Sequence, residues 1–216
     1  MITSIDNTNG DTNTELVLIV DNSGSMANML EETIHGINEF IDNQRKVEGN
    51  AKVTLVFFND EYEIPFNNID LKTFPKITVE HYHTSGMTAL LDAIGKTINI
   101  VRNRNTNPDK VIVCIITDGY ENSSTEFIGN VINKTIKSLE KDNNWEFMFL
   151  GADIDSFGVA GSLGINKNKI ANFAKTGRGT LDAFATMSVG AATYRSGGTD
   201  KDFDATTAYA NISKAT

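Results

Sequence analysis

The sequence predicts an α/β domain of Rossmann-like architecture, with an open, mainly parallel central sheet, one antiparallel edge strand and helices on both faces. Three observations predict it. Apolar runs of strand length alternate with segments whose apolar residues recur at helical spacing. Two of these runs end abruptly in an aspartate. One pair of strands is joined too closely for a crossover helix, so that pair is antiparallel. A length of 216 residues suits one domain.

The first half of the chain predicts a strand, a helix, a hairpin and a second helix. The first strand is ELVLIVD at 15–21, and the hairpin joins the strands at 52–60 and 61–66. Each helix shows one apolar stripe, which covers one face of a helix and favours packing on the sheet. The stripes are Leu30, Ile34, Ile37 and Ile41 for the first helix, and Leu91, Ile94, Ile98 and Val101 for the second.

The second half continues the alternation. Strands are predicted at 110–118, 145–153 and 169–174, with helices at about 155–163 and 180–195. A helix between the first two strands is marked by Ile128, Ile132, Thr135 and Leu139, with Ser123 or Ser124 as its N-cap. We therefore expect a domain at 15–196, between a flexible polar leader at 1–14 and a loose polar tail at 197–216.

Composition limits the classes of partner. The formal net charge is −9, whereas proteins that bind nucleic acid use lysine and arginine to replace the counterions of phosphates, so nucleic acid is excluded as a partner. The chain has neither a signal peptide nor an apolar stretch long enough to span a bilayer, which predicts a cytoplasmic protein without membrane contact. The single cysteine, Cys114, lies inside an apolar strand and is expected to be an inert core residue.

Polar side chains gather where the two aspartate-ended strands stop. Asp21 is followed by Ser23 and Ser25, Asp118 ends the strand that begins at Lys110, and Thr88 lies just before a helix. In open α/β sheets, ligands bind outside the carboxyl ends of the strands, where strand order reverses. If the two strands are neighbours, these five residues converge. Gly24 is expected to be glycine because a β-carbon would block the tight loop between the two serines.

The donors in this group are all oxygens. Hard oxygen ligands suit Mg²⁺, Mn²⁺ or Ca²⁺, while zinc and copper prefer sites with histidine or cysteine. Mg²⁺ is favoured, because it usually retains water and needs few protein ligands. For any one motif, an alternative is structural: Ser23 and Ser25 as turn residues, and Asp118 and Thr88 as helix caps.

Three short segments carry a resemblance to a known family. DNSGSM, SGMTALLDAI and ITDGYEN resemble, in this order, the three parts of the metal-ion-dependent adhesion site of von Willebrand factor A domains. The similarity covers roughly residues 15 to 195, and the chain looks most like small stand-alone bacterial or phage versions of the domain. The metal-site residues that this resemblance implies are Asp21, Ser23, Ser25, Thr88 and Asp118.

The resemblance also implies a function. It implies a protein-binding module without enzymatic activity, in which Ser23, Ser25 and Thr88 hold the metal directly while Asp21 and Asp118 act largely through water. Three neutral hydroxyls leave a divalent ion poorly neutralised, so an aspartate or glutamate of a protein partner is the expected further ligand. The oligomeric state and the partner's identity stay open.

Other functions were weighed against this one. A metal-dependent hydrolase in the same cleft lacks a histidine placed as a base, and a structural component of a phage particle or bacterial complex would need no vacant coordination position. A P-loop requires glycine where Leu90 stands, and a haloacid dehalogenase-like phosphatase requires a second aspartate where Ser23 stands. A serine hydrolase centred on Ser162 requires a later histidine, and all three histidines precede it.

Overall fold

A six-stranded sheet forms the centre of the molecule. The computed structural model describes residues 12–104, 106–141 and 144–215, and the strands lie in the order β3-β2-β1-β4-β5-β6. The strands are β1 (Asn13–Asp21), β2 (Asn50–Phe58), β3 (Tyr62–Asp70), β4 (Lys110–Thr117), β5 (Trp145–Ala152) and β6 (Ile170–Phe173). All adjacent pairs are parallel except β2–β3, as predicted.

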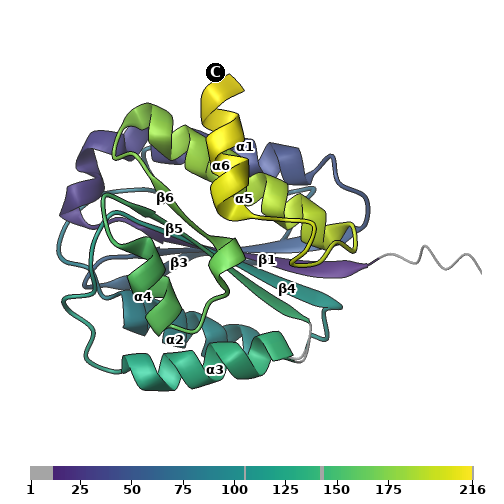
Figure 1. Ribbon diagram of the computed structural model, residues 1–216, viewed down its shortest axis with the longest axis horizontal. Coiled ribbons are helices and arrows are strands. Elements are labelled where there is room, and N and C mark those ends of the chain that lie inside the picture. Colours follow the sequence, from purple (N-terminus) through teal and green to yellow (C-terminus); the bar gives the residue numbers. More distant parts are fainter. Residues whose placement is uncertain (1–11, 105, 142–143, 216) are drawn as a thin grey trace, which may run out of the picture.

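Helices cover both faces of the sheet. In Figure 1, α1, α5 and α6 lie above it and α2, α3 and α4 below it. The described residues also form two short 3-10 helices, η1 (Gly24–Met29) and η2 (Lys167–Lys169). The α-helices are α1 (Leu30–Gln44), α2 (Leu90–Arg102), α3 (Gly129–Lys141), α4 (Ser156–Ser162), α5 (Gly177–Arg195) and α6 (Ala205–Ala215).

The central strand β1 faces a hydrophobic core on each side. Its alternate residues Leu16, Leu18 and Val20 pack in the cluster that includes α1 and α5, while Val17 and Ile19 pack in the cluster with α2 and α3. Successive side chains of a strand point to opposite faces, so a strand buried on both faces is apolar without interruption. This explains the LVLIV run, and it holds the end of β1 in one position.

The order in which successive strands join the sheet reverses between β1 and β4. The strands β2 and β3 extend the sheet on one side of β1, and β4, β5 and β6 extend it on the other. β1 and β4 are parallel neighbours from Thr14↔Lys110 to Val20↔Ile116. The expectation that the two aspartate-ended strands are adjacent is therefore confirmed, and both aspartates lie at the topological switch point.

The start of α3 differs from the prediction. α3 begins at Gly129, and neither Ser123 nor Ser124 is its N-cap. The preceding backbone is instead held by the Asp92 carboxylate of α2, which accepts hydrogen bonds from the amides of Thr125, Glu126 and Phe127 at 2.8 to 3.0 Å. Burial raises the pKa of Asp92, but these amides outweigh it and the net shift is downward. The prediction of a serine N-cap was wrong, because the carboxylate that binds the backbone amides before α3 comes from a different helix, α2.

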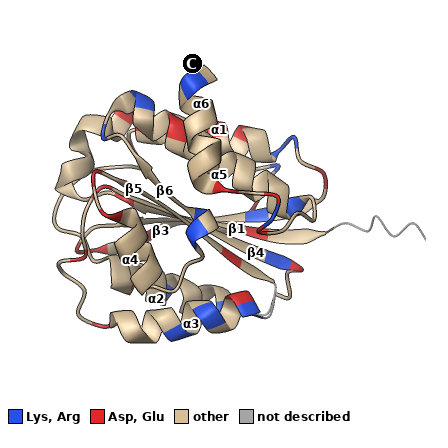
Figure 2. Cartoon of the chain, viewed as in Figure 1, with Lys and Arg blue, Asp and Glu red and all other residues tan. Residues whose placement is uncertain are grey.

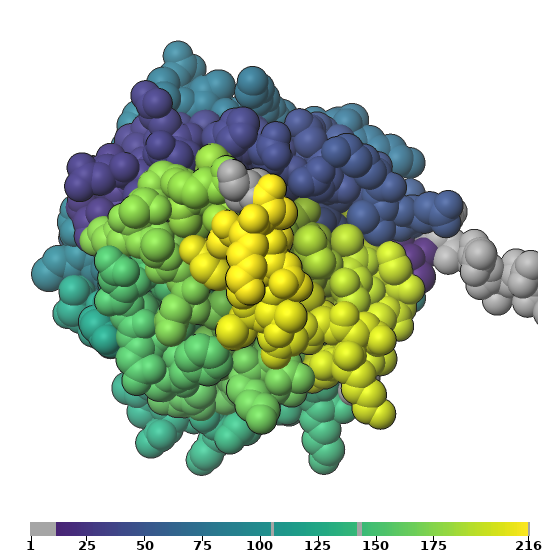
Figure 3. Space-filling view, turned by 45° about the horizontal axis from the view of Figure 1, so that its top comes forward, coloured from purple at the N-terminus to yellow at the C-terminus, as the bar shows by residue number. Residues whose placement is uncertain are grey.

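The C-terminal region also differs from the loose polar tail expected at 197–216. It contains helix α6, which lies against α5 and β6 and is the yellow segment across the front of Figure 3. Phe203 and Ala205 are buried, and Tyr194 packs edge-on against Phe203. These apolar residues dock the segment although most of its side chains are polar. Most of the predicted leader at 1–14 lies outside the described residues.

Two smaller expectations can be compared with the structure. Cys114 is fully buried in β4, and burial raises the pKa of its thiol, as expected of an inert core cysteine. None of the described helices combines the length and apolar character needed to cross a membrane. In Figure 2, basic and acidic residues are spread over several elements, so charge does not mark out one face in this view.

Candidate metal centre

Asp21 forms the floor of the site at the end of β1. Its side chain is fully buried. One carboxylate oxygen accepts from the backbone amide of Ser23 at 2.7 Å, and the other accepts from the Thr117 hydroxyl at 2.5 Å. The Tyr82 hydroxyl donates to the Asp21 carbonyl at 2.6 Å. Asp21 is therefore immobilised from three directions, which suits a group that orients ligands.

The two serines and Asp118 form a chain of oxygens above this floor. Ser23 Oγ lies 3.0 Å from Ser25 Oγ, and Ser25 Oγ donates to Asp118 Oδ1 at 2.5 Å. Ser23 and Asp118 are buried and Ser25 between them is exposed, so the row opens to solvent at its middle member. Because the Ser25 proton points at the Asp118 carboxylate, Ser23 is the donor in the contact with Ser25, and one lone pair of the Ser25 oxygen is left to face a cation.

Thr88 is brought to the same place by the loop that precedes α2. A β-carbon added to Gly119 would lie 2.8 Å from Thr88 Oγ1, so the threonine side chain packs directly on the residue after Asp118. Asn122 holds the Thr88 backbone through two hydrogen bonds. The side-chain Oδ1 of Asn122 accepts from the Thr88 backbone amide at 2.9 Å, and the backbone amide of Asn122 donates to the Thr88 carbonyl at 3.0 Å. The structure thus gathers all five predicted residues around the ends of β1 and β4.

Backbone hydrogen bonds lock the three contributing loops together. The amide of Ser85 donates to the Asn22 carbonyl at 2.9 Å, and the amide of Gly24 donates to the Gly86 carbonyl at 3.2 Å. Asn22 N donates to the Phe58 carbonyl at 2.8 Å, which ties the same loop to the end of β2. Main-chain hydrogen bonds therefore fix the loops that carry the hydroxyls.

The glycine that this loop arrangement requires is Gly86. Its φ is +69°, in the region that glycine favours, and a β-carbon there would overlap the Asp60 carboxylate. Gly24, which the sequence argument singled out, has no positive φ, and an added β-carbon would meet only the Gly86 carbonyl at 3.6 Å. The steric reason proposed for Gly24 is therefore wrong.

Burial shapes the electrostatics of the two carboxylates. It raises the pKa of Asp21 to about 6, against the lowering effect of the hydrogen bonds from Thr117 and Ser23, and the nearby Asp118 raises it slightly further. Asp118 is also nearly buried. Two carboxylates held close together with little solvent form a place where a cation is strongly favoured.

One cation of the chain already reaches this place. Lys175, from the segment between β6 and α5, places Nζ 2.8 Å from Asp118 Oδ2. The Lys175 side chain is 32% exposed while that of Asp118 is 0% exposed. Among the described residues, this oxygen has no hydrogen bond besides the ion pair. The ammonium group shows that a positive charge is accommodated at the carboxylate.

The donor set fits a small hard cation. It consists of hydroxyl and carboxylate oxygens, the ligands that Mg²⁺ and Mn²⁺ prefer. The Ser23 and Ser25 hydroxyls already face each other, and the positively charged ammonium group of Lys175 lies beside Asp118. Within the described ranges, no group of three or more histidine, cysteine, aspartate or glutamate side chains is placed to hold a metal, so the hydroxyls are needed.

A family comparison covers this constellation. Residues 16–121 match the model of the von Willebrand factor type A domain. This segment of the chain belongs to the von Willebrand factor type A family. The matched segment runs from β1 to the end of the ITDGYE stretch after β4, and all five site residues lie inside it. No curated protein sequence matches the chain significantly.

Solved structures share the fold of this von Willebrand factor A domain at low sequence identity. Proximal thread matrix protein 1 from the mussel byssus is 15% identical with a TM-score of 0.63, over 83% of this chain and 46% of that one. A von Willebrand factor type A protein from Catenulispora acidiphila is 16% identical with a TM-score of 0.60, over 82% and 42%. The chain thus spans less than half the length of these proteins.

Two further structures bear on the comparison. The PilB minor pilin of Streptococcus sanguinis is 12% identical with a TM-score of 0.63, over 88% of this chain and 63% of that one. The mussel protein has also been solved with a zinc-occupied MIDAS (metal-ion-dependent adhesion site) motif. That structure is 14% identical with a TM-score of 0.62, over 83% of this chain and 46% of that one. At these identities the likeness extends to the fold alone.

Sequence reasoning missed three contributors to the site. Thr117 and Asn122 flank Asp118 within the quoted ITDGYEN segment, so their polarity beside a strand end was the available signal. Lys175 carries no such signal, because it follows β6, two strands away from β4 in the sheet. Only the fold brings it to Asp118.

The His81-Tyr82-His83 segment lies in the loop region between β3 and α2. Tyr82 is buried beneath Asp21, whereas His81 Nδ1 accepts from the Thr78 amide at 3.1 Å. His83 contacts the site loop through its main-chain carbonyl, which accepts from Asn22 Nδ2 at 2.9 Å. These contacts give both histidines a structural role in the loop.

Proposed function

We propose that this von Willebrand factor A domain is a metal-dependent protein-binding module and not an enzyme. Ser23, Ser25 and Thr88 would hold a divalent ion directly, with Mg²⁺ as the first choice and Mn²⁺ or Ca²⁺ as alternatives. Asp21 and Asp118 would orient the hydroxyls and bind through water. A carboxylate from an aspartate or glutamate of a protein partner would complete the coordination.

The observation that carries the proposal is the row Ser23–Ser25–Asp118, with oxygens 3.0 Å and 2.5 Å apart, at the topological switch point. Carboxylates that accept from a ligand's hydroxyl fix its orientation and commonly tune metal affinity. Asp118 accepts a hydrogen bond from the Ser25 hydroxyl, and Asp21 accepts one from the Ser23 backbone amide. These bonds support the proposal that both carboxylates orient the ligands and do not bind the ion directly. The domain family and its zinc-occupied relative support the same interpretation.

The charge of the ligand set supports an acidic partner. Hydroxyl ligands carry no net charge, so an ion held by them keeps a strong attraction for an anion from outside. Ser25, in the middle of the row, is exposed, which leaves one side of the site open to solvent. An aspartate or glutamate side chain supplies a compact anionic oxygen for that side. We therefore expect the partner to present a carboxylate and not a basic patch.

The first experiment measures Mg²⁺ binding alone. Isothermal titration of the metal-free protein should show one site in the wild type and none in Thr88→Ala. Thr135→Ala is a matched control, because Thr135 lies on α3 and its hydroxyl donates only to the Val131 carbonyl. Titrations with Mn²⁺, Ca²⁺ and Zn²⁺ rank the ions. Equal binding by the wild type and Thr88→Ala would contradict the assigned ligands.

The second experiment tests the partner. The immobilised wild-type protein should retain a protein from its native cell in Mg²⁺ and release it on addition of chelator, whereas the Thr88→Ala protein should retain none. Asp→Asn or Glu→Gln substitutions in the captured protein then identify the coordinating residue by loss of binding. Retention that survives chelator, or a partner that binds without any acidic side chain, would overturn the proposed mode of recognition.

A further inference from the structure

We propose that Lys175 is a built-in competitor of the metal ion: its ammonium group neutralises Asp118 in the metal-free protein and must leave for the ion to bind tightly. The inference rests on the metal site of the proposed function and adds a residue that sets its affinity. It starts from the pairing of Lys175 Nζ with Asp118 Oδ2 at 2.8 Å.

The position of Lys175 makes this competition direct. The other oxygen of Asp118 accepts from Ser25, a member of the donor row, at 2.5 Å. A cation at Ser25 and an ammonium at Asp118 therefore share one carboxylate. Like charges in a nearly buried site repel strongly, while each is attracted by Asp118, so the two cations compete.

A comparison with a second lysine indicates that the Lys175 pair can be exchanged. Lys169, six positions earlier, is 3% exposed and contacts Glu140, Glu146 and Asp200 at 2.5 to 3.2 Å. Lys175 is 32% exposed, and one carboxylate is its ion-pair partner among the described residues. A buried charge with several partners is costly to displace, whereas a half-exposed lysine can turn into water at little cost.

The backbone around Lys175 does not depend on this ion pair. Thr176 caps α5 by accepting from the amide of Gly179 at 3.0 Å, and the amide of Ala174 donates to the Tyr209 hydroxyl of α6 at 3.2 Å. The segment is thus anchored on each side of Lys175. Its side chain can leave Asp118 without unfolding the start of α5.

The test compares Mg²⁺ titrations of the wild type, Lys175→Met, Lys175→Arg and Lys46→Met at one pH. Lys175→Met should bind Mg²⁺ roughly tenfold more tightly, because the competing charge is lost while the side-chain length is kept. Lys175→Arg should stay near the wild type. Lys46→Met removes an equal charge beyond the far end of α1, where Lys46 contacts Asn43, and should change nothing.

Thermal unfolding separates competition from a merely structural role. In chelator, Lys175→Met should unfold at a lower temperature than the wild type, because Asp118 has lost its counterion. With saturating Mg²⁺ the difference should vanish or reverse. Equal destabilisation in both conditions, with unchanged or weaker Mg²⁺ affinity, would overturn the competitor role and leave the metal site intact. Failure of all four proteins to bind Mg²⁺ or Mn²⁺ would instead overturn the metal site itself, and the competitor role with it.

Discussion

The two ends of β1 each hold a buried carboxylate, but they satisfy it differently. At the amino end, Glu15 pairs with Arg104, whose side chain is 11% exposed, and also accepts from the Thr54 hydroxyl at 3.2 Å. At the carboxyl end, Asp21 and Asp118 are surrounded by hydroxyls and one half-exposed lysine. In the first arrangement a largely buried arginine neutralises the carboxylate. The second leaves its positive charge exchangeable, which is what a binding site requires.

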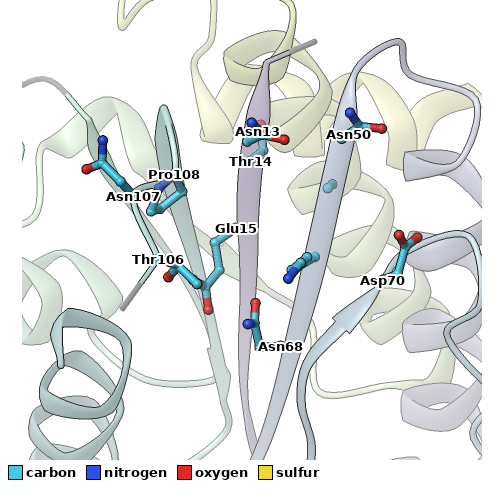
Figure 4. Close-up of a pocket in the computed structure, with 11 residues that line it drawn as sticks. Asn13, Thr14, Glu15, Asn50, Asn68, Asp70, Thr106, Asn107 and Pro108 are labelled. Atoms are coloured by element: carbon cyan, nitrogen blue, oxygen red, sulfur yellow. The ribbon is translucent and has the colours of Figure 1, made fainter. Parts of the chain in front are cut away.

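The amino end of β1 also borders a hollow. The structure has a cavity of about 510 Å³ at the amino end, shown in Figure 4, which is bordered by Asn13, Glu15, Asn68, Asp70 and Pro108. Its carboxylate Glu15 is already paired with an arginine. The size of a hollow therefore says less about metal binding than the presence of converging oxygens whose positive partner is partly exposed. The following predictions test this contrast, from the largest expected effect to the smallest.

Removal of both serine hydroxyls should abolish metal binding. Ser23→Ala combined with Ser25→Ala removes two proposed ligands, so Mg²⁺ affinity should fall by more than about 100-fold, beyond the loss typical of outer residues of metal sites. Calorimetric titration measures it. Ser138→Ala, on the exposed face of α3, should bind as the wild type does. Retained binding in the double variant would contradict the contrast between the two ends.

Removal of the arginine at the amino end should affect folding and leave the metal site alone. Arg104→Met leaves Glu15 buried without its cation, which should lower the free energy of unfolding by about 3 kcal/mol. Urea denaturation in the presence of chelator measures this loss. Adding Glu15→Gln should recover part of it, because the uncompensated charge is gone. A change in Mg²⁺ affinity would show that the two ends are coupled.

Metal binding should stabilise the fold in proportion to occupancy. At a free Mg²⁺ concentration 100 times the dissociation constant, the free energy of unfolding should rise by about 2.7 kcal/mol. Thermal unfolding with Mg²⁺ and with chelator measures the difference. Arg104→Met should show the same gain from a lower starting stability, whereas the Ser23→Ala, Ser25→Ala protein should show none. A gain that persists in the serine variant would point to a different binding site.

Loosening Thr88 should weaken the site more mildly. Asn122→Ala deletes the 2.9 Å hydrogen bond from the Thr88 amide while leaving every proposed ligand in the chain. Mg²⁺ affinity should fall by roughly tenfold, the low end of the range for residues that orient ligands. Calorimetry measures it, with Asn130→Ala on α3 as the control. Unchanged affinity would mean that the backbone bond from Asn122 to Thr88 positions the loop unaided.

Local patterns in the chain were sufficient to predict the architecture and to select the five residues of the proposed site, whose role as a metal site stays a prediction. Uninterrupted apolar runs in strands buried on both faces, and period-3.6 stripes in helices, follow from the geometry of each element, so the order of elements could be predicted without tertiary information. The short motifs around Asp21, Thr88 and Asp118 mark strand ends and a helix start, which the α/β topology brings together. The docked helix α6 was not predicted, since its packing depends on a few buried residues such as Phe203.

Contacts between distant segments depended on the folded structure. Gly86 must be glycine because Asp60 from another loop lies against it, and Asp92 holds the backbone before α3 from a different helix. Lys175 reaches Asp118 only because β5 and β6 line up beside β4. Periodicity reports how a residue sits within its own element. Which charge meets which carboxylate is decided by how elements pack, and that choice makes one end of β1 a sealed ion pair and the other a site with an exchangeable cation.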